Sequence, residues 1–304
     1  MKQEDATPIF VIGKHRSGTT GLANHLCEHT DVAGVQHEAH WGIHESGYYP
    51  YVVDRYGSLD CWPNFRAFVE VMNASDYFRL AGIEKEYMLS LYPTSYAGFF
   101  KAAMDEFARR RGVRYWLEKT PEHTKYAPRL AHTFSSARFV AIIRNVEAVI
   151  ASSLAQLSSP LESTHPLTLT RLVSGWVYYT KTIFRLNSRF PQRTVIVRYD
   201  NFRDKPSAIL RKVCANLGID YDDQMTTVPY AHNTSFPNES SRRALQPRHE
   251  TLIALLSGML QKVPHVTFRS LDQLARALRS TPNLPDWFFK LSDRDLRSSS
   301  VEVP

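Results

Sequence analysis

Short apolar runs rich in β-branched residues alternate along this chain with longer segments whose apolar residues recur at helical spacing. The runs predict core strands at residues 9–12, 32–35, 115–117, 138–143 and 194–197. The helical spacing predicts helices at residues 19–28, 148–157, 167–189 and 206–217. This alternation is typical of an α/β fold with three layers, α/β/α, around a central parallel sheet.

Between about residues 41 and 111 the alternation stops and aromatic residues accumulate. They are Trp41, Tyr48, Tyr49, Tyr51, Tyr56, Trp62, Phe65, Phe68, Tyr77, Phe78, Tyr87, Tyr92, Tyr96, Phe99 and Phe100. We interpret the segment as a mostly helical insertion in a single domain spanning residues 1–304. Each aromatic residue taken alone is expected in a core, whereas the group could line an apolar acceptor pocket or form a lid.

The composition is that of an ordinary globular protein, with 304 residues, 43% hydrophobic and 22% charged. The formal charge is +7 and the isoelectric point about 9.3, yet the cations are dispersed along the chain. Small anionic ligands therefore fit this charge, and a nucleic-acid partner is not expected.

The three cysteines, Cys27, Cys61 and Cys214, are widely spaced and follow no metal-ligand pattern, so neither a disulfide framework nor a metal site is expected. No apolar signal region precedes the first strand, and no stretch of 18 apolar residues occurs. These features predict a soluble cytoplasmic protein without a transmembrane segment.

The first apolar run leads into a loop with two glycines five positions apart, Gly13 and Gly18, and then into a helix. This spacing is that of the phosphate loop of P-loop nucleotide enzymes, but Thr19 stands where that motif has its lysine. The motif's lysine contacts the outer phosphates of a triphosphate, and its hydroxyl binds Mg²⁺. Here the cations, Lys14 and Arg16, lie inside the loop. An arginine fork beside backbone donors favours an anion bound without a metal.

A second candidate anion site follows the run at residues 138–143. Arg144 ends that run, and Ser152 comes eight residues later on the next expected helix. Both side chains could reach one anion at the carboxyl edge of the sheet, where open α/β folds bind ligands.

Together these motifs resemble a sulfotransferase that uses 3′-phosphoadenosine 5′-phosphosulfate (PAPS) as donor and releases adenosine 3′,5′-bisphosphate (PAP). The residues that match the family's 5′-phosphosulfate loop are Gly13, Lys14, His15, Arg16, Ser17, Gly18, Thr19 and Thr20. Arg144 and Ser152 match the 3′-phosphate motif, and Tyr199 resembles the tyrosine that approaches the adenine. Arg242 and Arg243 resemble a late basic loop that closes over the 3′-phosphate. The resemblance spans about residues 8–243 and implies a P-loop-like sheet and no metal.

The resemblance also implies a second catalytic cation beside Arg16. Lys119 follows the run at residues 115–117, where the family places a lysine near the transferred group. The alternative for Lys119 is a salt bridge with Glu118 or Glu122, and the alternative for Lys14 is a solvated charge.

The acceptor hydroxyl must lose its proton to a base. The resemblance favours Glu38, just past the second strand, with His37 and His123 as alternates. Cytosolic members instead place a histidine two residues beyond the lysine, where this chain has Pro121. Ordinary surface roles are expected for the remaining histidines, such as His25, His29, His40 and His44.

Two other readings remain open. A P-loop kinase would need a lysine at position 19 and a strand-end aspartate for Mg²⁺, and this chain has Thr19 and Arg144 there. A binding module could keep the fold without catalysis. For the transferase, the aromatic insertion favours a small-molecule, lipid or glycan acceptor, and the sequence leaves the oligomeric state open.

Overall fold

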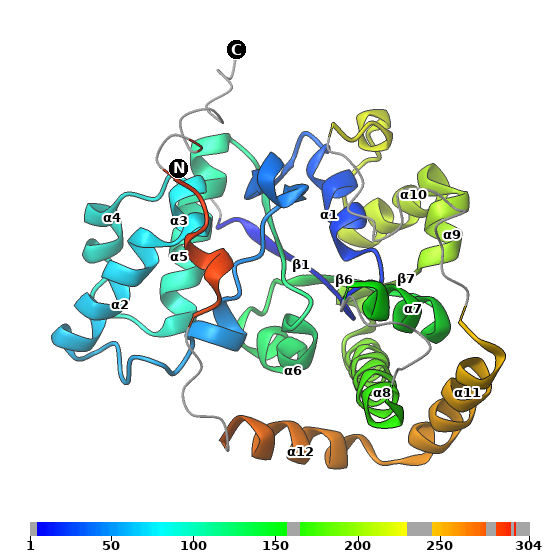
Figure 1. The fold of residues 1–304 in the computed structure, drawn as a ribbon. Helices are drawn as coiled ribbons and strands as arrows, with labels where there is room; N and C mark the ends of the chain where they lie inside the picture. The colour runs from blue at the N-terminus through cyan, green and yellow to red at the C-terminus, as the bar shows by residue number, and fades with distance from the viewer. Residues whose placement is uncertain (1–4, 157–164, 230–244, 278–283, 293–294, 296–304) are drawn as a thin grey trace.

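The structure is a computed structural model that describes residues 5–156, 165–229, 245–277, 284–292 and 295. Its main sheet is parallel, with the strand order β2-β5-β1-β6-β7. The strands are β1 Thr7–Gly13, β2 Val32–Gly34, β5 Tyr115–Lys119, β6 Arg138–Ile143 and β7 Thr194–Arg198. The strand at the centre of this order, β1, is the one that leads into the glycine loop (Figure 1).

Side chains of β1 alternate between the two faces of the sheet, and each face has its own core. Ile9 and Val11 pack in one buried cluster together with residues of α1 (Thr19–Cys27) and α10 (Pro206–Leu217). Phe10 and Ile12 belong to the opposite cluster. That second cluster contains residues of α5 (Tyr96–Arg111), α6 (His123–Thr133) and α8 (Pro166–Arg189). Helices therefore cover both faces, which confirms the predicted three layers.

The insertion adds helices α2 (Trp62–Ala74), α3 (Asp76–Leu80) and α4 (Lys85–Ser90) beside α5. Most of its aromatic side chains belong to the core on that face of the sheet. Those with at most 3% exposure are Tyr48, Tyr49, Phe65, Phe68, Tyr77, Phe78, Phe99 and Phe100. Trp41 and Trp62 differ, with 47% and 43% exposure. Much of the segment is helical in the structure, and most of its aromatic residues have a packing role.

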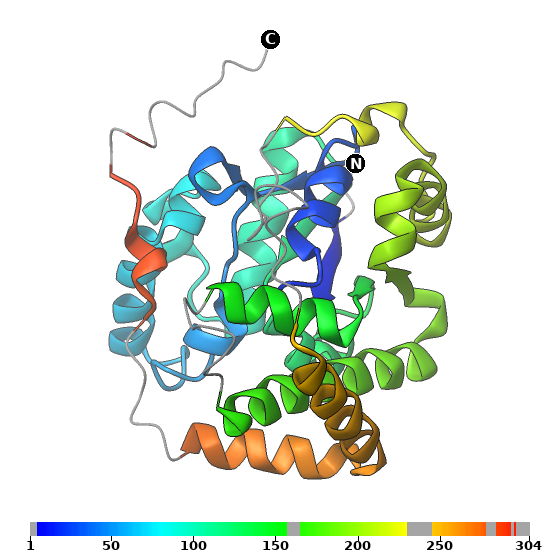
Figure 2. The ribbon, with the colours of Figure 1, turned by 45° about the vertical axis from the view of Figure 1, so that its right-hand side comes forward.

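The remaining elements are short or peripheral. They are β3 Gln36–His37, β4 Gly42–Ile43, α7 Val146–Gln156, α9 Tyr199–Asp204, α11 Pro247–Lys262, α12 His265–Ala277, and the short helices η1 Glu38–His40, η2 Tyr48–Val52, η4 Pro191–Arg193, η5 Asp223–Thr226 and η7 Asp286–Phe289. Both α11 and α12 pack along α8 (Figure 2). Among the described residues, no helix has the length and apolar character needed to cross a membrane.

Candidate active site

The glycine loop connects β1 to α1 in a conformation that glycine tolerates best. Gly18 has a φ of 91° and Arg16 a φ of 70°, both in the left-handed region. A Cβ atom on Gly18 would lie 2.6 Å from the Tyr199 ring, so a larger residue would collide there. The loop is thus closely packed against the start of α9. Tyr199 is the first residue of that helix and lies just beyond β7.

Residues at the start of α6 hold the loop from the other side. The Gly13 N–H donates to Thr124 Oγ1 over 2.9 Å, and the Thr124 hydroxyl donates back to the Gly13 carbonyl over 3.1 Å. His15 Nε2 lies 2.6 Å from Glu122 Oε1. Burial alone would raise the pKa of Glu122, but the hydrogen bond and charge of His15 lower it to about 2. The predicted loop residue His15 is therefore tied to an ionised carboxylate.

The hydroxyl residues of the loop lie at its end and in the first turn of α1. Ser17 and Thr19 are buried, whereas Thr20 is partly exposed. The Ser17 N–H donates to the Lys14 carbonyl over 3.0 Å, which closes the loop on itself.

The two anion motifs predicted from the sequence meet in the structure. Arg16 Nε donates to Ser152 Oγ on α7 over 3.0 Å, and Arg144 Nη1 donates to the Arg16 carbonyl over 3.1 Å. The Arg144 guanidinium stacks 4.2 Å from the centroid of the Tyr199 ring. Trp176 Nε1 of α8 donates to the Arg144 carbonyl over 2.9 Å, which fixes the strand end. Residues separated by up to 136 positions thus form one cationic site.

The electrostatic environment of this site favours a bound anion. Burial, followed by the nearby charge of Arg144, lowers the pKa of Arg16. Burial also lowers the pKa of Lys14 to about 8, and Lys125 adds to this while Glu122 opposes it. Lys14 Nζ lies 5.1 Å from the Tyr179 ring centroid, so the half-buried side chain lies against α8. Clustered, partly desolvated cations repel one another, and an anion between them relieves that repulsion.

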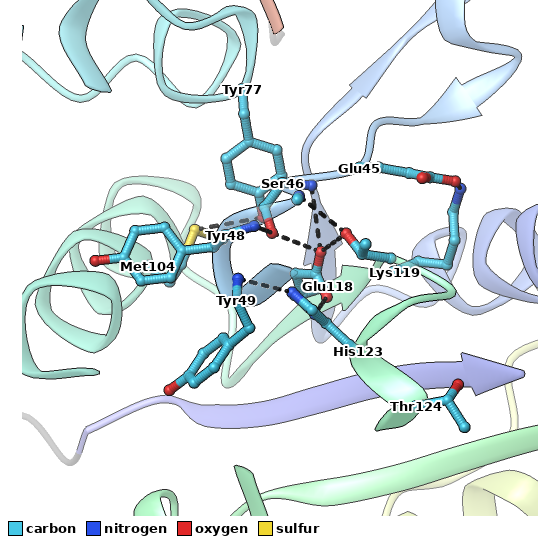
Figure 3. Close-up of polar contacts among 12 residues, drawn as sticks. Glu45, Ser46, Tyr48, Tyr49, Tyr77, Met104, Glu118, Lys119, His123 and Thr124 are labelled. Atoms are coloured by element: carbon cyan, nitrogen blue, oxygen red, sulfur yellow. Dashed lines mark hydrogen bonds and ion pairs between the residues drawn. The ribbon is translucent and has the colours of Figure 1, made fainter. Parts of the chain in front are cut away.

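Lys119 ends β5, beside β1, and its side chain is buried. Its Nζ donates to Glu45 Oε1 over 2.6 Å (Figure 3). The alternative considered for Lys119, a salt bridge with Glu118 or Glu122, does not form: Lys119 pairs with Glu45, and Glu118 and Glu122 each bind a histidine. Glu45 carries no signal in the sequence, because it lies in the irregular segment that contains β4, without a strand or helix pattern to place it.

Glu118 is the centre of a buried polar network beside Lys119 (Figure 3). Its Oε1 accepts from Ser46 Oγ over 2.7 Å and from Thr120 Oγ1 over 2.6 Å. Its Oε2 lies 2.5 Å from His123 Nδ1, and the Tyr49 N–H donates to His123 Nε2 over 3.3 Å. Burial would raise the pKa of Glu118, but the charge and hydrogen bond of His123 outweigh it, and the net shift is downward. Both ring nitrogens of His123 are thus engaged inside the protein.

The other base candidates lie past β2, on β3 and η1. Glu38 begins η1 and is exposed, whereas His37 is buried. His37 Nδ1 accepts from the Ala39 N–H over 3.1 Å, and its Nε2 lies 3.4 Å from the Asp295 carbonyl. Glu38 is therefore the candidate whose side chain is open to an acceptor. Arg242 and Arg243 lie outside the described residues.

The architecture is a P-loop-like α/β fold with a cationic loop after the central strand of its parallel sheet. Residues 8–223 match the sulfotransferase family model, and the chain belongs to the sulfotransferase family. It is accordingly an enzyme of that class, and the family implies PAPS as the donor. No curated protein matches the chain.

Two solved structures share this fold at low sequence identity. The sulfotransferase domain from the curacin biosynthetic pathway is 16% identical, with a TM-score of 0.53 over 84% of this chain and 99% of that one. The sulfotransferase domain from the Synechococcus PCC 7002 olefin synthase is 17% identical, with a TM-score of 0.52 over 94% and 98% of the two chains. A mouse sulfotransferase, SULT7A1, solved in complex with PAP, is 12% identical, with a TM-score of 0.45 over 90% of each chain.

Proposed function

We propose that this protein transfers a sulfuryl group from PAPS to a hydroxyl or amine acceptor by in-line displacement, without a metal in the transfer step. The observation that carries the proposal is the contact of Arg16 with Ser152 and Arg144. PAPS has two separated anionic ends, and one sequence motif is expected to bind each end. The contact of Arg16 with Ser152 and Arg144 brings these two motifs together at one edge of the sheet.

Each end of the donor has its own set of residues in this proposal. The loop from Gly13 to Thr20 binds the 5′-phosphosulfate through its backbone amides, its hydroxyls and Arg16. Arg144 and Ser152 bind the 3′-phosphate, and Tyr199 lies against Arg144, where the adenosine would follow. Arginine suits both sites because its planar fork can donate two parallel hydrogen bonds to one anion.

During transfer, the bond from sulfur to the phosphate oxygen breaks and a bond from sulfur to the acceptor oxygen forms. Negative charge develops on the leaving phosphate oxygen, and Arg16 and Lys119 stabilise it. Lys119 reaches this position from β5, and its bond to Glu45 fixes the direction of the flexible side chain. PAP is the second product.

Glu38 accepts the proton of the acceptor hydroxyl in this mechanism. His37 and His123 already use both ring nitrogens inside the protein, so they support the site rather than act as the base. The backbone N–H of Trp41 donates to the backbone carbonyl of Glu38 over 2.9 Å. The Trp41 side chain is 47% exposed. An exposed indole three residues along the chain from the base favours a small-molecule, lipid or glycan acceptor with an apolar or ring surface.

The donor is tested first, by calorimetric titration of PAP in the presence of EDTA. We expect binding that Mg²⁺ does not change, and no binding of ATP that depends on Mg²⁺. Binding of ATP that depends on Mg²⁺, without binding of PAP, would instead establish the kinase reading.

The transfer itself is tested with ³⁵S-labelled PAPS and a panel of phenols, lipids, sugars and amines. We expect labelled product with the wild type and less than about 1% of that rate with Glu38→Gln, since a lost general base costs 10²–10⁴-fold. Glu86→Gln, an exposed substitution on α4, is the control. PAP binding without transfer to any acceptor would favour the binding-module reading. Full activity of Glu38→Gln would exclude Glu38 as the general base. Glu45 would then be the next candidate, which the matching Glu45→Gln variant tests.

A further inference from the structure

Two histidines and an aspartate form a compact cluster outside the donor site. They are His40 at the end of η1, His44 just after β4, and Asp76 at the start of α3. Each offers one ligand atom, and the three atoms lie within 4.8 Å of one another. His44 is 2% exposed and Asp76 is fully buried, so the surface role expected for His44 from the sequence is wrong.

One side-chain atom of each of these three residues is buried without a hydrogen bond. Among the residues that the structure describes, His40 Nε2, His44 Nε2 and Asp76 Oδ1 have no hydrogen-bond partner. Arg79 Nη1 lies 3.9 Å from Asp76 Oδ1, which is too far for a hydrogen bond. A buried polar atom without a partner costs about 1–3 kcal/mol, so three such atoms together indicate a missing ligand.

The backbone holds the two histidines close together through a tight turn. Trp41 and Gly42 have φ values of 55° and 98°, and the His40 and His44 ring centroids are 3.7 Å apart. Asn24 of α1 fixes this turn: its Nδ2 donates to the Trp41 carbonyl over 2.7 Å, and its Oδ1 accepts from the backbone N–H of the residue before His44 over 2.8 Å. The pairing of the two rings is therefore built into the fold.

Asp76 is held through one carboxylate oxygen and presents the other. Its Oδ2 accepts from the N–H groups of Lys290 and Leu291 over 2.8 and 3.0 Å, which leaves Oδ1 toward the histidines. These contacts join α3 to the segment around η7, and Figure 1 shows that segment running beside the insertion helices.

We propose that His40, His44 and Asp76 bind one divalent transition-metal ion of the zinc type, with water completing the coordination. Two imidazoles and one carboxylate are a ligand set that suits zinc better than Ca²⁺ or Mg²⁺, which prefer oxygen ligands. In a tetrahedral site with bonds of about 2.0–2.2 Å the ligand atoms lie about 3.3 Å apart, so metal binding would draw these three atoms, which lie within 4.8 Å of one another, closer together.

The surrounding charges are compatible with such an ion. The cations that face the cluster are Lys119, Lys290 and Arg79, and Lys119 is neutralised by Glu45 at 2.6 Å.

The ion's role follows from the elements that its ligands join. His40 and His44 belong to the segment that contains Glu38 and Glu45, and Asp76 belongs to the insertion. A metal bound there would hold the acceptor side of the active site against α3. This role is structural, and the sulfuryl transfer described above does not pass through the ion.

The inference is tested by zinc titration of the full chain after dialysis against EDTA, with a chromophoric chelator as competitor. We expect one Zn²⁺ per wild-type chain, and at least a 100-fold weaker affinity in His44→Ala and Asp76→Asn. His132→Ala, which removes an exposed histidine of α6, is the control and should bind zinc as the wild type does. Substitution with Co²⁺ should give visible absorption bands typical of a site with fewer than six ligands.

Asp76→Asn also addresses folding, because its amide oxygen can still accept from Lys290 and Leu291. Circular dichroism should show this variant folded, and zinc should raise the melting temperature of the wild type but not that of the variant. A wild type that binds no zinc, or variants that bind it as tightly as the wild type, would overturn the inference. PAP affinity is measured in parallel and should not change when zinc is removed, so this result is independent of the proposed function.

Discussion

Arg144 connects three parts of the active site, because its side chain contacts the glycine loop and Tyr199 while its carbonyl binds α8. We expect Arg144→Ala to weaken PAP binding by about 10- to 100-fold, since hydrogen bonds to charged groups contribute about 1.5–3 kcal/mol. Calorimetric titration measures the change. Arg66→Ala, at an exposed position of α2, is the matched control. An unchanged dissociation constant for Arg144→Ala would remove the 3′-phosphate role.

Substitution of Lys119 should affect turnover more than PAP binding, because we place this residue at the transferred group. Lys119→Ala is expected to lower kcat by at least 100-fold while PAP affinity changes less than 10-fold. Steady-state kinetics with labelled PAPS, combined with PAP titration, separates the two quantities. An equal loss in both would show that Lys119 acts in donor binding instead.

Lys14 makes the donor site sensitive to pH. Its pKa of about 8 in the free protein lies below the ordinary 10.5, and a bound phosphate would raise it. Between the free and bound values the complex holds more protons than the free protein, so PAP affinity should fall as pH rises above about 8. We expect proton uptake on binding at pH 8.5, measured by calorimetry in two buffers of different ionisation enthalpy.

Lys14→Met should abolish this uptake, whereas Lys212→Met, an exposed lysine of α10, should retain it. Uptake that persists in Lys14→Met would assign the titration to another group.

The effect of pH on the stability of the free protein is the reverse of its effect on PAP binding. The free protein should become more stable between about pH 8 and 10.5, because the unfolded chain still holds the proton there.

At the scale of elements, the sequence predicted the sheet better than the connections. Runs such as residues 138–143 are buried on both faces of a parallel sheet, so their apolar character marks them directly. Helix α7 begins at Val146, two residues before its predicted start. The pair β3 and β4 was not predicted, since two-residue strands carry no period. The partner of Lys119 was missed for the same reason: tertiary packing alone brings Glu45 to it.

The glycine loop is the element whose geometry the sequence predicted most directly, and it can be tested by a pair of glycine substitutions. Gly18→Ala places a side chain at a φ of 91° and 2.6 Å from Tyr199. We expect it to lower the free energy of unfolding by about 2 kcal/mol and to weaken PAP binding at least 10-fold. Urea denaturation and PAP titration measure the two effects.

Gly21→Ala is the matched control on the same helix. A Cβ atom there has no neighbour within 4 Å, and Gly21 lies inside α1. We expect it to raise the free energy of unfolding by about 0.4–1 kcal/mol and to leave PAP binding unchanged, because alanine favours the helix. Wild-type PAP affinity in Gly18→Ala would contradict the importance of the loop conformation.

At the scale of the whole molecule, the aromatic insertion continues the core of the sheet. The Phe100 ring stacks 4.5 Å from the Tyr48 centroid and lies 5.8 Å from Trp116 of β5. Trp116 in turn lies 5.5 Å from Phe10 of β1. A core shared in this way predicts that the insertion and the sheet unfold as one unit, as expected for a single domain.

Phe100→Ala tests this prediction. Removing a fully buried phenylalanine should lower the free energy of unfolding by about 3–5 kcal/mol in one transition, the same by circular dichroism and by tryptophan fluorescence. Phe184→Ala, which removes a ring that is 46% exposed on α8, should cost much less. PAP should raise the melting temperature of both variants, since Phe100 is not part of the donor site and PAP binds only the folded sheet. If the insertion were instead a separate lid, Phe100→Ala would produce an early transition that PAP does not shift, and the wild-type transition would remain.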